Sequence, residues 1–322
     1  MHKLLVSSSP HIKSPQTTES IMLYVIIALF PSMVAAVVIF GTKAIWLMAT
    51  CVISAVASEA LARFLMKRDV GTVLDLSAVV TGLILALNLP VTFPLWMAAV
   101  GSAFAIIVVK QLFGGIGQNV INPAAAARIF LLISFSGQMT LYVTPFRPDA
   151  IAEATLLGIL KEHPDVVTGN NYLSLFLGNK AGVMGEVCGL AIVIGFVFLV
   201  ATKVIRPHAP VAFAVTFMGL YYLMGKDGLY MLLLGGALFG AVFMMTDYTT
   251  TPVTDWGKII FGVGCAVITV LIRQFGSYPE GISFSIVLMN ILVPYICLLY
   301  TSLRTGALSP SLQGELAAAK AG

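Results

Sequence analysis

The most constraining feature of this sequence is an internal repeat. Pro-Val-Thr occurs at 90–92 and again at 252–254, and each copy precedes a glycine-studded apolar stretch. Each stretch ends in a cation followed by glutamine, at Lys110-Gln111 and at Arg273-Gln274, with a glycine shortly after. A single one-residue gap aligns the two blocks. The repeat indicates that one domain was duplicated within this chain.

The composition places this duplicated domain in a membrane. Hydrophobic residues make up 59% of the chain and charged residues only 10%, with a mean hydropathy of +0.98. A soluble domain is about 25% charged, so this chain has too little polar surface to cover a globule in water. A spanning helix needs about 20 mainly apolar residues. Candidate spans lie at about 21–40, 44–65, 73–89, 94–112, 121–135, 183–204, 210–224, 229–246, 257–275 and 282–303.

The candidate spans predict an all-α, polytopic membrane protein of about ten transmembrane helices in two inverted five-helix repeats. An odd number of spans in each half forces the halves into opposite orientations, and a site or pathway often lies between such repeats. We expect the repeats at 21–135 and 183–304, joined by an extracytoplasmic loop at 136–182. We expect a cytoplasmic segment at 1–20 and a cytoplasmic tail at 305–322.

The distribution of positive charge favours a cytoplasmic location for both termini. With ten spans, most Lys and Arg residues, Lys110 among them, fall on the side of the N-terminus. The short outer loops carry only Lys43, Lys226 and Arg273. Cytoplasmic loops generally carry the excess of Lys and Arg, so we expect a multi-pass protein of the cytoplasmic (inner) membrane. No basic stretch is interleaved with aromatics, so nucleic acid is not an expected partner.

The four cysteines lie inside apolar runs and form no CxxC pair; they are Cys51, Cys188, Cys265 and Cys297. We expect them to behave as small buried hydrophobic side chains. We expect no metal or iron–sulfur centre held by this chain alone.

The loop Gly114–Ala124, GGIGQNVINPA, interrupts the apolar pattern. Its glycines permit unusual backbone angles and close approach to a ligand, and Asn119 and Asn122 offer amide donors and acceptors. Exposed backbone at membrane depth is tolerated only where protein, water or a ligand satisfies it. The loop is therefore either a segment that lines a ligand or ion site, or a tight connector in which Asn122 caps the helix that begins at Pro123.

Three acids at the ends of candidate spans are candidates for ion coupling: Asp75, Glu186 and Asp247. An acid at a membrane boundary costs free energy unless it is paired or hydrated. Such an acid is therefore a functional candidate by default. Each also has a structural interpretation, either as a solvated helix end or, for Glu186, as a favourable charge at a helix N-terminus. Glu59 lies one turn before Arg63, where an i,i+4 ion pair is the simpler interpretation.

Several stretches together resemble one family of membrane proteins. The similarity covers nearly the whole chain and rests on SPHIKSPQTTESIMLYVIIALFP, TGLILALNLP, GGIGQNVINPA, MMTDYTTTPVTDWGKIIFG and RQFGSYPEGISFSIVLMNILVP. The family contains the D subunit of the Rnf electron-transport complex and the homologous B subunit of the sodium-translocating NADH:quinone reductase. The resemblance implies one component of an ion-translocating ferredoxin:NAD oxidoreductase, with the A, B, C, E and G subunits of Rnf, the lipid bilayer and Na⁺ or H⁺ as partners. No catalysis is then expected from the isolated chain.

The resemblance also implies a covalent flavin. Family members carry FMN joined by a phosphoester to a threonine in an outer loop, where an Asp precedes Ser-Gly-Ala-Thr. Asp149, Ala154 and Thr155 match this pattern, so Thr155 is the implied attachment residue. Ala152-Glu153 replaces the Ser-Gly pair, which removes the backbone freedom of a glycine and places a negative charge beside an incoming phosphate. The alternative is a subunit that has lost this flavin.

A second flavin, non-covalent riboflavin, is implied near the cytoplasmic side. Asn119, Asn122 and Asp247 match positions linked to it in relatives, and amides and a carboxylate can bond a flavin ring edge and its ribityl hydroxyls. A flavin on each side would let electrons cross the membrane within this chain. Two other classes stay open, a flavin-free channel or transporter for a small solute and a scaffold that only clamps redox partners.

Overall fold

The structure, a computed structural model, describes residues 17–67, 75–152, 157–158, 160, 172–276 and 280–305, with backbone alone at 147–152 and 299–305. The expected cytoplasmic segment at 1–20 is described only from residue 17, and the expected tail at 305–322 only at its first residue. The implied flavin residue Thr155 and its neighbours Glu153 and Ala154 lie outside the described residues.

The first half of the chain folds into helices that follow the first five candidate spans. They are α1 (Thr18–Phe40), α2 (Thr42–Leu65), α3 (Ser77–Leu87), α4 (Leu95–Phe104), the π-helix η2 (Ala105–Gln111) that continues α4, and α5 (Pro123–Ser134). Gly41 turns the chain between α1 and α2 with a φ of +75°, a conformation that favours glycine.

The second half follows a connecting region. The connecting region holds α6 (Ser136–Met139), the antiparallel strands β1 (Tyr142–Thr144) and β2 (Arg147–Ala152), and α8 (Tyr172–Leu177). The second half then contains α9 (Gly189–Ala201), α10 (His208–Leu223), α11 (Gly228–Leu233), α12 (Ala237–Phe239), the π-helix η3 (Gly240–Met244), α13 (Asp255–Phe275) and α14 (Ile282–Thr305).

The sequence predicts one continuous span at 229–246, and this prediction is wrong because the helix is interrupted. The chain breaks between α11 and α12, where Gly235 has a φ of +70°. Arg273 of α13 donates to the carbonyls of Met231 and Leu234 at 3.0 and 3.1 Å. The guanidinium therefore bonds carbonyls at the end of α11, which is the condition for a broken helix in apolar surroundings.

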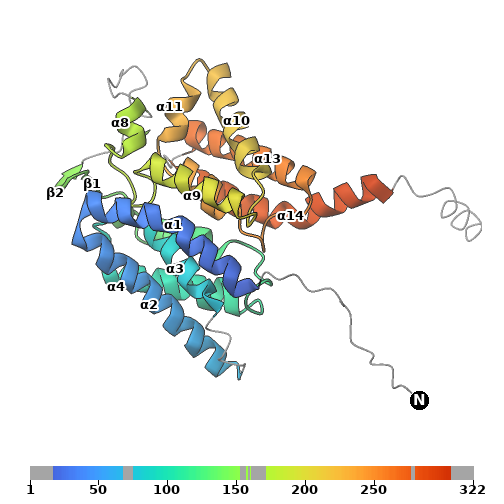
Figure 1. Cartoon of the computed structure of the whole chain (residues 1–322), viewed down its shortest axis with the longest axis horizontal. Coiled ribbons are helices and arrows are strands. Elements are labelled where there is room, and N and C mark those ends of the chain that lie inside the picture. Colours follow the sequence, from blue (N-terminus) through green and yellow to red (C-terminus); the bar gives the residue numbers. More distant parts are fainter. Residues whose placement is uncertain are drawn as a thin grey trace, which may run out of the picture.

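Corresponding helices of the two halves meet across the molecule (Figure 1). α1 packs along α9, and α5 packs against α14. Within each half the second helix packs against the fourth, as α2 does against α4 and α10 against α13. A duplicated domain predicts this correspondence, and it agrees with the repeat in the sequence.

The apolar surface of the helices fits a lipid environment. Three described helices, α1, α2 and α13, are long and apolar enough to cross a membrane by length and composition, and six further described helices are apolar but shorter. Large apolar side chains such as Phe30, Trp46 and Phe64 are exposed, whereas a soluble monomer rarely exposes wide apolar patches. Cys51 and Cys265 are buried, and Cys188 and Cys297 are partly buried.

The hairpin and the start of α1 lie at opposite ends of the molecule (Figure 1). The amide of Phe146, between β1 and β2, donates to the carbonyl of Ile39 near the C-terminal end of α1 at 3.2 Å. α1 has 23 residues, and a helix of that length is about 35 Å long. That length is comparable to the roughly 30 Å hydrocarbon core of a bilayer.

Close packing of α1 on α9 depends on Gly195. A Cβ placed on Gly195 would lie 2.4 Å from the carbonyl oxygen of Ala28. We expect Gly195→Ala to separate the two helices and to destabilise the protein by about 1–3 kcal/mol. The thermal midpoint of unfolding in detergent measures this effect.

Gly219 of α10 provides the matched control, because a Cβ there would meet nothing within 4 Å. Gly219→Ala should leave the midpoint unchanged or raise it, since alanine is the better helix former by about 0.5–1 kcal/mol. Equal midpoints for the two variants would contradict the close α1–α9 contact.

Candidate functional site

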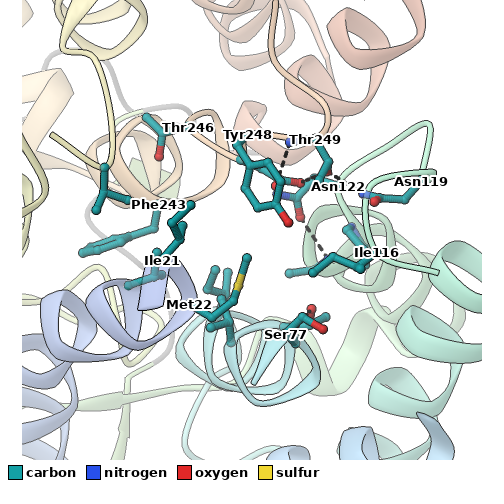
Figure 2. Close-up of a pocket in the computed structure, with 18 of the residues that line it drawn as sticks. Ile21, Met22, Ser77, Ile116, Asn119, Asn122, Phe243, Thr246, Tyr248 and Thr249 are labelled. Carbon is teal, nitrogen blue, oxygen red and sulfur yellow. Dashed lines mark hydrogen bonds between the residues drawn. The ribbon is translucent and has the colours of Figure 1, made fainter. Parts of the chain in front are cut away.

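A pocket opens at the N-terminal end of α1, between the two halves (Figure 2). It encloses about 800 Å³ of space, which includes open solvent. Apolar side chains such as Met22 and Phe243 form much of its wall, and the polar groups of Asn119, Asp247 and Thr249 also line it. Small-molecule pockets typically combine an apolar wall with a few polar groups in this way.

The polar wall of this pocket joins the glycine-rich loop to the segment after η3. Asn119 Nδ2 donates to Thr249 Oγ1 at 3.0 Å. Thr249 Oγ1 donates to Asp247 Oδ2 at 3.0 Å, and the Thr249 amide donates to Asp247 Oδ1 at 3.3 Å. The structure therefore brings together Asn119 and Asp247, two of the three residues that the resemblance linked to riboflavin.

Asn122 also lines the pocket, but its hydrogen bonds serve the fold. Its Oδ1 accepts from the amides of Ala124 and Ala125 at 3.0 and 3.1 Å, which caps α5. Its Nδ2 donates to the carbonyl of Met244 at 3.1 Å, and its amide donates to Asn290 Oδ1 at 3.1 Å. The connector interpretation of the loop is confirmed for Asn122, while Asn119 lies on the wall of the pocket.

Asp247 has an unusual electrostatic environment. Burial raises the pKa of its carboxyl above the ordinary value, against hydrogen bonds from Thr249, Thr250 and Asn119 that lower it. Among the residues that the structure describes, Asp247 takes part in no ion pair. A carboxylate with this burial and these hydroxyl neighbours is suited to interact with a bound cation or a ligand donor.

Beside the pocket lies a buried network around Glu59, which is fully buried. The predicted i,i+4 pair with Arg63 is present at 2.9 Å. Lys110 Nζ lies 3.0 Å from both carboxylate oxygens of Glu59, and Gln111 Nε2 donates to Oε1 at 2.7 Å. Lys110 also donates to Ser77 Oγ, and both residues line the pocket.

Asp75 belongs to the edge of the same network. Its Oδ1 accepts from the amide of Ser77 at 3.0 Å, and its Oδ2 lies 3.8 Å from Arg63. Asp75 thus supports the start of α3 and faces a cation. Its environment differs from that of Asp247, although the sequence grouped the two acids together.

The two cations of the sequence repeat are buried, which the charge distribution did not predict. The sequence placed Lys110 and Arg273 in loops on opposite sides of the membrane, but each residue is only 3% exposed. Lys110 neutralises Glu59, and Arg273 bonds carbonyls at a helix break. Only contacts between distant segments reveal these roles, so neither residue belongs in a count of loop charges.

Glu186 lies toward the hairpin end of the molecule, away from this pocket. It precedes α9 by three residues, so it lies just before the helix and not at the helix start that the sequence predicts. Its carboxylate interacts electrostatically with three cations, Arg128, Lys180 and Arg273. Its Oε2 has no hydrogen-bond partner among the described residues. Burial lowers the pKa of Lys180 to about 8, against the nearby Glu186 carboxylate that raises it.

Arg128 is a buried charge that the sequence pattern did not single out. It lies in α5 and donates to Asn88 Oδ1 at 3.1 Å and to Ser283 Oγ at 3.3 Å, and it forms an ion pair with Glu280. A single arginine inside an apolar candidate span was the available signal, because such residues are rare and usually functional. In the described part of the chain no cluster of His, Cys, Asp and Glu could hold a metal ion.

The fold and the pocket define a class of protein: an all-helical protein with apolar helices that suit a membrane and with a pocket between interrupted helices. Residues 5–304 match the NQR2, RnfD, RnfE family, and the chain belongs to that family.

Named relatives cover nearly the whole chain. The D subunit of the Na⁺-translocating ferredoxin:NAD⁺ oxidoreductase complex of Acetobacterium woodii is 47% identical over 299 residues, covering 91% of this chain and 92% of that protein. The D subunit of the ion-translocating oxidoreductase complex of Stutzerimonas stutzeri is 36% identical over 87% of this chain and 90% of that protein. The D subunit of the proton-translocating ferredoxin:NAD⁺ oxidoreductase complex of Clostridium ljungdahlii is 36% identical over 90% of this chain and 92% of that protein.

The Glu59 network generates a stability prediction. Lys110→Met removes one of the two cations beside a fully buried carboxylate, and breaking a buried ion pair costs about 3–5 kcal/mol. We therefore expect a marked fall in the thermal midpoint of unfolding in detergent.

The double variant Glu59→Gln, Lys110→Met should recover part of that loss, because it removes the uncompensated charge along with its partner. Lys226→Met is the control, since Lys226 donates to the neutral side chain of Gln274 at 3.0 Å. A double variant less stable than Lys110→Met alone would contradict the pairing of Glu59 with Lys110.

Proposed function

We propose that this chain is the D subunit of an Rnf-type, ion-translocating ferredoxin:NAD⁺ oxidoreductase complex in the cytoplasmic membrane. The observation that carries the proposal is the pocket where Asn119, Asn122 and Asp247 converge from the two halves. The named relatives, which are D subunits of ion-translocating oxidoreductase complexes and similar over nearly their full length, support the same function. The chain acts with the other Rnf subunits, and the isolated chain is not an enzyme by itself.

The side chains that line the pocket suit a flavin that carries no phosphate. Its apolar wall suits the faces of an aromatic ring system, and Asn119, Thr249 and Asp247 offer groups for the ring edge and the ribityl hydroxyls. Among the described residues, Lys110 is the only Lys or Arg that lines it, and Lys110 is occupied by Glu59 and Ser77. Riboflavin therefore fits this donor set better than a phosphorylated flavin does.

Thr155 is the proposed attachment residue for covalent FMN. It follows β2, and the hairpin of β1 and β2 contacts the end of α1 opposite the pocket. A flavin at each end of α1 would serve electron relay across the membrane, because flavins accept one or two electrons.

Asp247 is the strongest of the three proposed ion-coupling acids. Asp75 faces Arg63, and Glu186 is surrounded by three cations, so both carboxylates already have compensating charge. Asp247 has no such partner among the described residues. An electron added nearby would favour entry of a cation beside this carboxylate, because opposite charges attract strongly where the dielectric constant is low.

The covalent flavin is tested first by intact mass. The subunit, purified after co-expression with its flavin transferase, should carry the added mass of an FMN phosphoester. Thr155→Val should abolish that addition while the complex still assembles, because valine has no hydroxyl to esterify.

Thr168→Val is the control within the same connecting region and should keep the added mass. An unmodified native subunit would contradict attachment at Thr155. A subunit without either flavin would favour the solute channel or the scaffold.

The second prediction concerns Asp247. Asp247→Asn should reduce ion uptake per NADH formed several-fold in vesicles that contain the complex, while assembly is retained, because the variant loses the negative charge that would attract the cation. Uptake is measured separately for Na⁺ and for H⁺, and riboflavin content is measured in the same preparation.

Asp255→Asn is the matched control, because Asp255 is a partly exposed acid at the start of α13 that pairs with Arg206. It should leave the ratio of ions to NADH unchanged. Normal coupling in Asp247→Asn would remove Asp247 from the mechanism.

A further inference from the structure

A cluster of charged side chains lies on the surface where α10 and α13 begin. Arg206 forms an ion pair with Asp255, the first residue of α13. The Asp255 carboxylate also interacts electrostatically with His208 and Lys258, and Lys258 interacts with Arg206. We call these four residues the α10–α13 surface. Its two strong bases face a single acid, so this part of the described structure carries an excess of positive charge.

Close packing of the two helices fixes this surface. α10 lies along α13 (Figure 1). A Cβ on Gly262 would lie 2.5 Å from the carbonyl oxygen of Ala209, so the helices touch close to where both begin. Val204 and Ile205, in the connection before α10, line the pocket. The α10–α13 surface therefore lies at the pocket end of the molecule.

Exposed apolar side chains extend along both helices from this end. On α13 they recur every three or four residues, at Trp256, Ile260, Val263, Val267 and Leu271. On α10 Val211 and Val215 are exposed one turn apart. Side chains at these spacings share one face of a helix. Trp256 is 62% exposed in the first turn of α13, and tryptophan is enriched at the boundary between membrane and water.

We propose that the α10–α13 surface binds the head group of an acidic phospholipid whose acyl chains lie along the exposed apolar faces. Charge complementarity selects this occupant, because Arg206 and Lys258 both attract a phosphate. A zwitterionic lipid has a second, positive group that these cations oppose. The positive-inside distribution places this end on the cytoplasmic side, where acidic lipids attract basic residues near the membrane surface. The inference depends on neither flavin.

Arg206 is free to exchange one anion for another. Its side chain is 60% exposed, and the Asp255 side chain with which it pairs is 45% exposed. An exposed ion pair contributes little to stability, whereas a guanidinium bonds a phosphate strongly and often with two parallel hydrogen bonds. A lipid phosphate can therefore compete with Asp255 for Arg206 without a change in the fold.

The experiment is native mass spectrometry of the full chain in detergent. The probes are phosphatidylglycerol and phosphatidylcholine with identical acyl chains, added in equal amounts. The native chain should retain phosphatidylglycerol in preference to phosphatidylcholine. Arg206→Gln and Lys258→Gln should each reduce that preference about fivefold, and the double variant should reduce it further, because each variant removes one cation near the lipid phosphate. Retention of phosphatidylcholine should not change.

Two variants provide controls. Lys226→Gln removes a cation at the opposite end of the same helices, where Lys226 donates to Gln274 of α13 at 3.0 Å. It should leave the lipid preference unchanged. Arg206→Lys keeps the charge and should retain most of the preference, which separates loss of a cation from a local change of structure.

Two further measurements identify the occupant. Glycerol 3-phosphate, added in large excess, should not displace the lipid, because it lacks the acyl chains that contact the apolar faces. The assembled complex should show the same difference in retained phosphatidylglycerol between the native chain and the double variant as the isolated chain does.

The outcomes decide the inference without reference to the redox function. Loss of the preference in the Gln variants, with both controls near the native value, would support it. An unchanged preference in the double variant would overturn it. Displacement by glycerol 3-phosphate would indicate a site for a free phosphate and would also overturn it. A preference present in the isolated chain and absent from the complex would show that another subunit covers the surface, and the lipid assignment would fail.

Discussion

The arrangement of this protein depends on satisfying the backbone where helices are interrupted in apolar surroundings. Asn122 and Asn290 do this where the two halves meet. Asn122 caps α5 and binds the carbonyl of Met244, while Asn290 accepts from the Asn122 amide and donates to the carbonyl of Thr250 at 3.0 Å. Because these bonds join the glycine-rich loop to the segment after η3, they also fix the distance between Asn119 and Asp247. The pocket is a consequence of this junction.

The sequence predicted the helical framework well because that framework follows from local hydrophobicity. Each candidate span contains a helix, and the repeat corresponds to matching helix contacts in the two halves. The break at Gly235 and the late start of α9 were not predicted, since both depend on distant partners. Arg273 bonds carbonyls beside the break, and the amide of Gly185 donates to the carbonyl of Leu87 at 2.7 Å, in the segment before α9.

The sequence predicted only part of the candidate site, because the rest depends on contacts between distant segments. Asn119, Asn122 and Asp247 came from motif resemblance, and the structure places all three at one pocket. The sequence could not separate the three acids, because the difference lies in charge partners contributed by other helices. Arg63 faces Asp75, and cations from three segments surround Glu186, whereas no ion pair was found for Asp247 in the described part of the chain. Residue type alone carries no such information.

The two ends of the molecule differ in the sign of the excess charge in their interior. In the pocket near the start of α1 the cation Lys110 is neutralised by Glu59, and Asp247 adds an acid that forms no ion pair with any described residue. At the hairpin end, the described cations Arg128, Lys180 and Arg273 outnumber the described acids Glu186 and Glu280. Negative charge is therefore favoured at the hairpin end and a cation at the pocket. The placement of interior charge therefore gives the two ends of the molecule opposite preferences for a bound ion.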